Sequence, residues 1–174
     1  MSLPMKNPSC IMIVSDTTKA QSLSDVKEAV KMVSLLIGRK GQGKTKRMVD
    51  LANDSMEKAH GSIVFINKNQ RLMHDLTYRI RVVCMDEFED ITNSDEYIGF
   101  IYGIISSDHD IEKIFIDSIL KHADVQMSDL PEFLGRLHQI SERFKKDFIV
   151  SISADPNELF GIDFTDFDIL KLNE

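Results

Sequence analysis

The sequence predicts a three-layer α/β sandwich with a central, mainly parallel sheet. Strand-sized apolar runs rich in Ile, Val and Phe alternate with segments of helical periodicity. A glycine-rich octapeptide, GRKGQGKT at residues 38–45, joins one of these runs to the first helical segment. Strands that alternate with helices usually pair in parallel, because each helix carries the chain back across the sheet. Helices are therefore expected on both faces of the sheet.

Six apolar runs flanked by turn or polar residues are expected to form strands: Ile11–Val14, Met32–Ile37, Ile63–Ile66, Ile80–Met85, Ile114–Ile116 and Phe148–Ile152. The C-terminal segment IDFTDFDIL, at residues 162–170, is expected to close the sheet as an edge strand. Its acidic side chains would then face water, which protects an open edge from pairing with other chains.

Three segments are expected to be helical: Thr45–Ala59, Tyr97–Ile105 and Leu130–Lys145. In the first, Met48, Ala52, Ser55, Met56 and Ala59 fall on one face that would pack on the sheet. Asp129 and Glu132 have the spacing of a capping box at the start of the last. Gly99 and Gly103, one turn apart, predict close packing of the middle helix on the sheet.

Length and composition predict one soluble domain over residues 1–174, without a Pro- or Gly-rich linker or a repeat. Met1–Pro4 precede a second methionine, Met5, and are set aside as a leader. The net charge of -7 makes nucleic acid an unfavourable partner, because most of the surface repels a phosphate backbone. A partner protein is expected, of unknown kind.

Cysteine and histidine usage predicts a cytoplasmic protein without a structural metal site. Cys10 and Cys84 are far apart, which fits a reducing compartment, and none of the five histidines pairs at metal-ligand spacing. The longest apolar run, Tyr97–Ile105, is about half of the roughly 20 residues that span a bilayer. No charged segment with a cleavage site opens the chain, so no membrane anchor is expected.

The octapeptide satisfies the phosphate-loop pattern GxxxxGK[ST] in full, with Gly38, Arg39, Lys40, Gly41, Gln42, Gly43, Lys44 and Thr45. Glycines allow several backbone N–H groups to point inward at one anion, and the helix that follows presents its positive end. Lys44 is expected to bridge the β- and γ-phosphates, and Thr45 to place its hydroxyl on Mg²⁺. The loop therefore predicts binding of a nucleoside triphosphate.

A phosphate loop needs a carboxylate at the tip of a neighbouring strand to hold Mg²⁺. Asp117 ends the strand IFID, and Asp86 with Glu87 follows the run VVCM. We favour Asp117, because the next strand, FIVSIS, ends in Ser153 at the height of a γ-phosphate-sensing hydroxyl. Asp86 opens the acidic run DEFED, which is typical of a solvated loop, and it remains the alternative metal ligand.

The segments GRKGQGKT, IFIDS and FIVSISAD together resemble the P-loop NTPase superfamily from about Lys31 onward. The chain also resembles small single-domain proteins of anaerobic Firmicutes that carry the label twitching-motility or PilT-like ATP-binding protein. This resemblance implies binding of ATP or GTP with Mg²⁺, with Lys44, Thr45 and Asp117 in the matching positions. The acidic and histidine boxes of true pilus-retraction ATPases have no equivalent here, so no pilus role is implied.

ATPases of the additional-strand class often carry Glu directly after the metal-binding Asp, and here that residue is Ser118. Slow hydrolysis is therefore expected, with Ser153, Asp155 or Glu87 left as candidates for the general base. The favoured function is a Mg²⁺-dependent ATP-binding protein with weak NTPase activity. The alternatives are a non-hydrolysing nucleotide sensor or scaffold, and a small-molecule kinase whose lid would come from Arg71, Arg79 and Arg81. No guanine-reading NKxD motif stands where a GTPase needs one, which favours ATP over GTP.

Overall fold

A computed structural model of the 174-residue chain describes residues 32–122, 125–155 and 157–172. They belong to one compact unit, Lys31–Glu174. The predicted strand Ile11–Val14 and the leader Met1–Pro4 lie outside the described residues. A single domain over the whole chain therefore stays a prediction.

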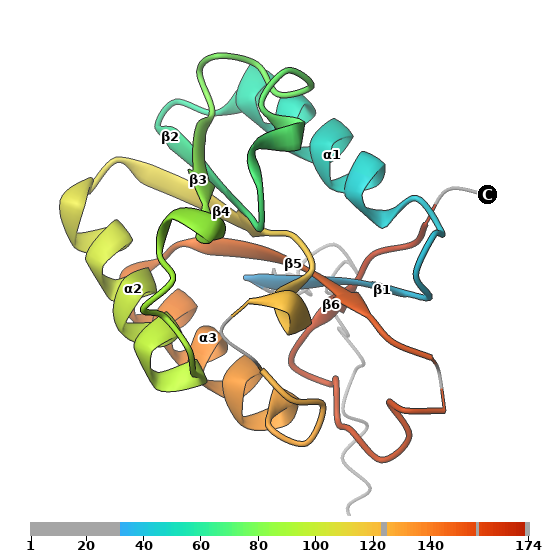
Figure 1. Ribbon diagram of the computed structural model, residues 1–174. Coiled ribbons are helices and arrows are strands. Elements are labelled where there is room, and N and C mark those ends of the chain that lie inside the picture. Colours follow the sequence, from blue (N-terminus) through green and yellow to red (C-terminus); the bar gives the residue numbers. More distant parts are fainter. Residues whose placement is uncertain (1–31, 123–124, 156, 173–174) are drawn as a thin grey trace, which may run out of the picture. The chain divides into compact units, whose positions relative to one another are not determined.

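The centre of this unit is a six-stranded sheet in which all pairs of neighbouring strands are parallel (Figure 1). The strand order is β3-β2-β4-β5-β1-β6. The predicted parallel sheet is confirmed. Its strands are β1 (Val33–Gly38), β2 (Ser62–Asn67), β3 (Arg81–Cys84), β4 (Ile111–Ile116), β5 (Asp147–Ser153) and β6 (Asp168–Ile169).

Helices cover both faces of the sheet, as the sequence predicts (Figure 1). Helix α1 (Lys44–Lys58) packs on one face, and α2 (Ser94–Ser107) and α3 (Leu130–Phe144) lie on the other. Each face has its own apolar core, because residues of a central strand point alternately to the two sides. In β1, for example, Leu35 belongs to the core under α2 and α3, and Leu36 to the core under α1. The three-layer α/β sandwich is confirmed.

Helix α1 forms because its apolar residues recur at the helical period and meet the sheet. Met48, Ala52 and Met56 are buried, as predicted, together with Val49. The helix ends at Lys58, and the backbone N–H of Ala59 caps it by donating to the carbonyl of Ser55, 2.9 Å away.

Two predicted details of the other helices are wrong. Asp129 makes no side-chain cap at the start of α3, because its backbone is already helical and its carboxylate accepts from Ser128 Oγ instead. Gly99 and Gly103 do not pack on the sheet, because both are exposed and a methyl group at either would meet no atom within 4 Å. The buried face of α2 consists of Tyr97, Ile98, Ile101, Ile104 and Ile105.

The C-terminal edge strand is present but short. Only Asp168 and Ile169 form β6 beside β1, and Asp168 is exposed as expected. Three short 3-10 helices connect the larger elements: Gln70–Leu72, Met85–Glu87 and Ile119–Lys121. Within the described residues, no helix is both long and apolar enough to cross a bilayer.

The strand order decides which loops meet at the carboxyl edge of the sheet. The strand that leads to Asp117 is β4, and β5, which ends in Ser153, lies between it and β1. Strand β5 therefore neighbours the phosphate-loop strand and β4 is the next strand along, so both lie near it, as predicted. Asp86 follows the edge strand β3, four strand spacings from β1, or about 19 Å at about 4.8 Å each.

Candidate functional site

The loop between β1 and α1 depends on two glycines with left-handed backbone conformations. Gly41 has φ 87° and Gly43 has φ 79°, which a side chain rarely tolerates. Gly43 is the N-cap residue of α1, so the loop runs directly into the positive end of that helix. These conformations explain why the octapeptide requires glycine at both positions.

Lys44 is folded back over the loop that precedes it. Its ammonium donates to the carbonyl oxygens of Gly38 at 2.8 Å and Arg39 at 2.7 Å, and the residue is only 5% exposed. An ammonium has three N–H donors, so one donor stays available for an anion. Burial lowers the pKa of Lys44, and the charge of Asp117 partly opposes this shift.

Thr45 and Asp117 meet at the first turn of α1. Thr45 Oγ1 donates to Asp117 Oδ2 over 2.9 Å, and Ser151 Oγ donates to Asp117 Oδ1 over 2.7 Å. Asp117 is 3% exposed, and its backbone N–H donates to the carbonyl of Ile66 in β2. The carboxylate is therefore fixed by contacts from α1 and β5, and the backbone of Asp117 by a contact from β2.

Ser118 has the left-handed conformation, with φ 60° and ψ 53°, although it is not glycine. Its buried backbone N–H donates to Ser151 Oγ over 2.7 Å. Ser151 therefore links Asp117 and Ser118, a role that our sequence reasoning missed. The available signal was the spacing of Ser151 and Ser153, which puts two hydroxyls on one face of an otherwise apolar strand.

Ser153 ends β5 directly beside the phosphate loop. It pairs with Gly38 in the sheet register, and the backbone N–H of Ala154 donates to the carbonyl of Gly38 over 3.2 Å. The side chain is half-buried, and its hydroxyl makes no hydrogen bond within the described residues. It is thus available to a ligand in the loop.

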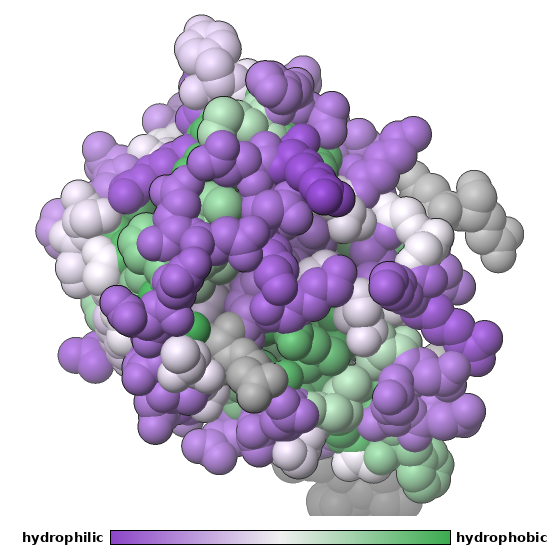
Figure 2. Space-filling model, viewed as in Figure 1, coloured by the Kyte–Doolittle hydropathy of each residue, from purple (hydrophilic) through white to green (hydrophobic). Residues whose placement is uncertain are grey.

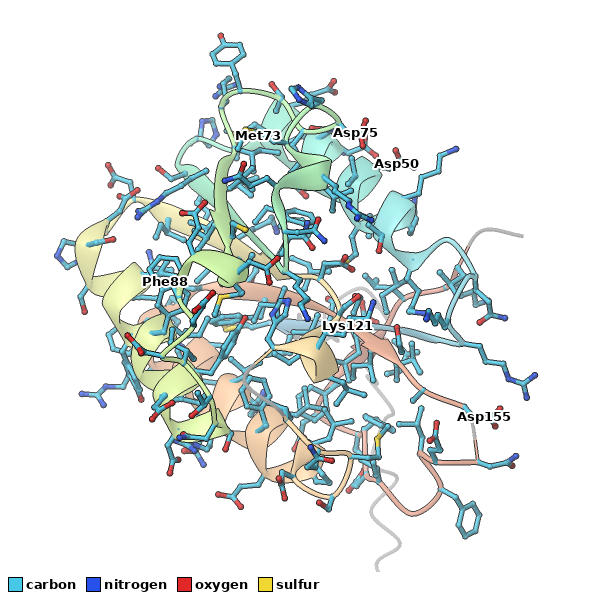
Figure 3. The ribbon with its side chains drawn as sticks, viewed as in Figure 1. Asp50, Met73, Asp75, Phe88, Lys121 and Asp155 are labelled. Carbon is cyan, nitrogen blue, oxygen red and sulfur yellow. The ribbon has the colours of Figure 1, made fainter. Side chains whose placement is uncertain are left out.

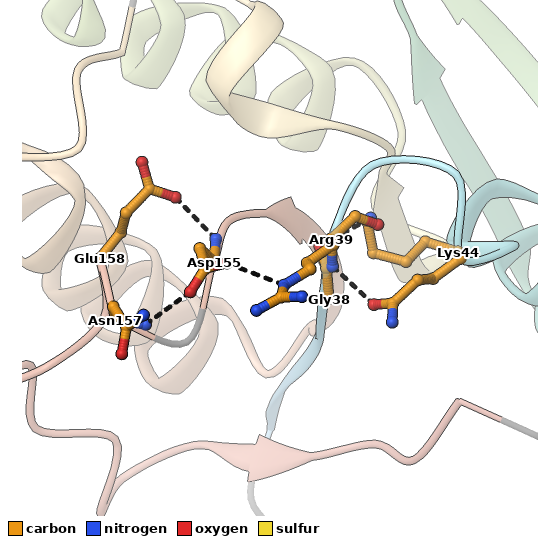
Figure 4. A network of polar contacts seen from close by, with 7 residues as sticks. Gly38, Arg39, Lys44, Asp155, Asn157 and Glu158 are labelled. Carbon is orange, nitrogen blue, oxygen red and sulfur yellow. Dashed lines mark hydrogen bonds and ion pairs between the residues drawn. The ribbon is translucent and has the colours of Figure 1, made fainter.

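Asp155 holds the tip of the phosphate loop through Arg39 (Figure 4). Arg39 Nε lies 2.8 Å from Asp155 Oδ2, and Asp155 Oδ1 accepts from the backbone N–H of Asn157 over 3.0 Å. The bond from Asn157 lowers the pKa of Asp155, and Arg39 adds to the shift. Within the loop, Gln42 Oε1 accepts from the backbone N–H of Arg39 over 2.6 Å, whereas Lys40 is exposed.

The acidic residues that follow β3 lie away from this group. Asp86 is exposed, and Glu87 accepts from Gln70 Nε2 over 2.7 Å at the same edge of the sheet. Neither residue lines the cavity that contains Thr45 and Asp117. The structure thus brings Asp117 to the loop and leaves Asp86 and Glu87 at the far edge.

A family model described as RNA helicase matches residues 34–111. The matched span begins in β1 and ends at the first residue of β4, so it contains the phosphate loop but not Asp117. It covers less than half of the 174 residues. No curated protein sequence matches the chain significantly. The match, the all-parallel sheet and the loop at the start of α1 agree with the predicted fold, that of a P-loop NTPase domain.

The donor set of this P-loop domain fits Mg²⁺. This ion takes oxygen ligands, and proteins usually hold it by one or two carboxylates together with substrate phosphates. Within the described residues, no three His, Cys, Asp or Glu side chains form a cluster that could hold a metal by themselves. The Thr45 hydroxyl donates its hydrogen bond to Asp117, so the lone pairs of the hydroxyl oxygen remain available to a cation.

Proposed function

We propose that the protein binds a purine nucleoside triphosphate with Mg²⁺, ATP in preference to GTP, and hydrolyses it slowly. The observation that carries this proposal is the 2.9 Å hydrogen bond between Thr45 and Asp117 at the mouth of the phosphate loop. A hydroxyl and a carboxylate in this relation suit a metal ion that also contacts the β- and γ-phosphates.

In this function each residue of the loop region has a chemical role. Backbone N–H groups of residues 38–45 surround the β-phosphate, and Lys44 supplies a positive charge toward the γ-phosphate. Thr45 and Asp117 would hold Mg²⁺, and the ion would supply positive charge to the phosphate oxygens. Ser153 contacts the γ-phosphate by its hydroxyl. The missing guanine-reading motif supports ATP over GTP.

Slow hydrolysis is proposed because Ser118 stands where a glutamate would polarise the attacking water. A hydroxyl is a poor base at neutral pH. The backbone N–H of Ser118 is bonded to Ser151, so its position is fixed beside Asp117. The same observation supports the second candidate function, a nucleotide sensor or scaffold that binds without turnover.

A small-molecule kinase remains a third candidate because of Arg71. This residue lines the cavity beside Thr45 and Asp117, as a cation that neutralises a transferring phosphoryl group would. Arg79 and Arg81, the other predicted lid residues, do not line that cavity. Of the three predicted lid arginines, only Arg71 therefore supports the kinase alternative.

The family resemblances contribute nucleotide binding alone to the proposal. The name of the matched family implies action on RNA, which the net charge of -7 disfavours. The resemblance to proteins labelled PilT-like supports ATP as the ligand. It does not imply a role in pilus retraction. The buried thiol of Cys84 forms no disulfide within the part of the chain that the structure describes, which supports a reducing, cytoplasmic location. Signalling by the bound nucleotide requires a partner protein.

The decisive experiment measures affinity for ATP and GTP with Mg²⁺, together with phosphate release, beside Lys44→Ala. We expect binding and slow release in the natural protein and loss of both in the variant. Lys58→Ala is the matched control, because it removes an exposed charge at the far end of α1. Binding without release above the Lys44→Ala background would favour the sensor. Absence of nucleotide binding would refute the proposal.

A further inference from the structure

The cavity that contains Thr45 and Asp117, of about 200 Å³, opens at the carboxyl ends of β2 and β4. Thr45 and Asp117 form one wall, and Asn67, Lys68, Arg71 and Lys121 lie around it. Figure 3 labels Lys121 near the middle of this face and Asp155 toward its right margin. Figure 2, drawn from the same side, shows mostly hydrophilic residues over the centre. The proposed nucleotide site uses the wall formed by Thr45 and Asp117, and the kinase alternative adds Arg71.

Three cations line this cavity, and its wall also holds one carboxylate, that of Asp117. None of Lys68, Arg71 and Lys121 makes an ion pair with any residue that the structure describes, although the chain carries a net charge of -7. Burial, and then the charges of Lys68 and Lys121, lower the pKa of nearby His122 to about 4. Three cations against one carboxylate leave the cavity with a positive balance of charge, which favours the arrival of an anion.

Hydrogen bonds fix the backbone from which these three side chains extend. The carbonyl of Lys68 accepts from the backbone N–H of Asp86 over 2.9 Å. The N–H of Arg71 donates to Asn69 Oδ1 over 3.2 Å, and the N–H of Lys121 donates to the carbonyl of Ser118 over 2.8 Å. The positions of the three residues are therefore set before a ligand binds, and the ligand has to order their exposed side chains.

The size of the cavity limits the ligand to a small group. Pockets for drug-sized ligands usually measure about 300–1,000 Å³, so this one is too small for a nucleoside. Lysine and arginine together supply many N–H donors, and an arginine fork matches phosphate oxygens. Asn67 adds an amide that is 6% exposed and uses one of its two N–H donors on the carbonyl of Asn69.

We propose that this cavity binds the terminal phosphate of a second, phosphorylated small molecule, beside the nucleotide. The inference rests on the proposed function, since it takes the loop to be the nucleotide site. A phosphomonoester suits three cations better than a phosphodiester, because it carries about two negative charges. Its phosphate would lie next to Thr45 and Asp117, within reach of the nucleotide's terminal phosphate.

The test titrates inorganic phosphate into protein saturated with a non-hydrolysable ATP analogue and Mg²⁺, followed by calorimetry. We expect saturable phosphate binding in the natural protein. The double variant Lys68→Gln with Lys121→Gln should weaken it at least about 10-fold, because it removes two charged donors, and should change the affinity for the analogue less than about 3-fold. The control Lys58→Gln should leave both affinities unchanged.

Three results would overturn this assignment. Phosphate that binds only when the nucleotide is absent occupies the loop itself. A double variant that loses affinity for the triphosphate analogue but not for ADP shows that the cations hold the γ-phosphate. Displacement of phosphate by a short single-stranded oligonucleotide with hydroxyl ends indicates a phosphodiester ligand. Inorganic phosphate is also titrated into Lys44→Ala without nucleotide. Because this variant lacks a working nucleotide site, phosphate binding to it reports on the cavity alone. Failure of the cavity is thereby distinguished from failure of the nucleotide site.

Discussion

The hydroxyl of Thr45 lies 2.9 Å from a carboxylate oxygen of Asp117, across a separation of 72 residues in the chain. Thr45 lies in the first turn of α1, and Asp117 directly follows β4. The contact forms because the carboxyl ends of parallel strands share one edge of the sheet. Ser151 fixes the other oxygen of the same carboxylate at 2.7 Å. Asp117 is therefore preorganised toward the loop.

Replacement of Thr45 should remove the dependence of nucleotide binding on Mg²⁺. We expect Thr45→Ala to lower ATP affinity in Mg²⁺ at least about 10-fold, equivalent to about 1.4 kcal/mol, and to have little effect when EDTA is present. Calorimetric titration of ATP in both buffers measures this.

The matched variant is Thr45→Ser, which keeps the hydroxyl that donates to Asp117. It should retain affinity within about 3-fold, a difference below about 1 kcal/mol. Equal losses in the Ala and Ser variants would contradict metal ligation by this hydroxyl.

Replacement of the two serines of β5 should have different effects, on stability for Ser151 and on phosphate release for Ser153. Ser151→Ala leaves Asp117 Oδ1 and the buried N–H of Ser118 without a partner, so it should lower the free energy of unfolding by about 1–3 kcal/mol. Ser153→Ala should change stability by less than about 0.5 kcal/mol, because its hydroxyl bonds to no described residue. Urea denaturation measures both.

Ser153→Ala should nevertheless slow phosphate release if its hydroxyl contacts the γ-phosphate. Unchanged release at saturating ATP, with normal stability, would remove Ser153 from the proposed site.

Restoring a carboxylate at position 118 should raise turnover. Ser118→Glu provides a general base next to Asp117, and such a base contributes about 10²–10⁴-fold in enzymes. The backbone and the neighbours of residue 118 are not shaped for a glutamate, so the gain should be smaller than in those enzymes. We expect a rise of at least about 10-fold in phosphate release. Ser118→Gln has the same size and no basic carboxylate, and it should stay at the natural rate. Equal rates in the two variants would show that the missing base does not limit hydrolysis.

Stability should depend on the protonation of His122. This residue is 2% exposed, its Nδ1 lies 3.2 Å from the hydroxyl of Tyr97, and its Nε2 has no partner within the described residues. Burial lowers its pKa from 6.5 to about 4. Between these values the unfolded chain binds a proton that the folded chain does not, so stability is full above pH 6.5 and falls as the pH falls toward 4.

Thermal or urea unfolding at pH 7.5 and pH 5 measures the effect. The natural protein should lose about 2 kcal/mol more than His122→Gln over this range, since glutamine accepts from Tyr97 without titrating. His109→Gln removes an exposed histidine and should leave the loss unchanged. The same loss in His122→Gln as in the natural protein would show that His122 is not the titrating group.

Local chemistry in the sequence determined the elements and the phosphate loop. The loop needs glycine where φ is positive, and Gly41 and Gly43 occupy those positions, so the pattern could be identified without the fold. The helical period of Met48, Ala52 and Met56 likewise predicted the face that packs on the sheet. Helix ends were less certain, because the cap expected from Asp129 required a backbone conformation that this residue does not adopt.

Only the tertiary structure decided which distant groups meet. Asp86 and Asp117 both follow apolar strands, and the order of strands in the sheet brought Asp117 to Thr45 and left Asp86 at the far edge. The contact of Ser151 with Asp117 and the convergence of the cations around Asn67 also depend on which strands are neighbours. Strand order is set by the packing of the whole core, which no short segment of sequence encodes by itself.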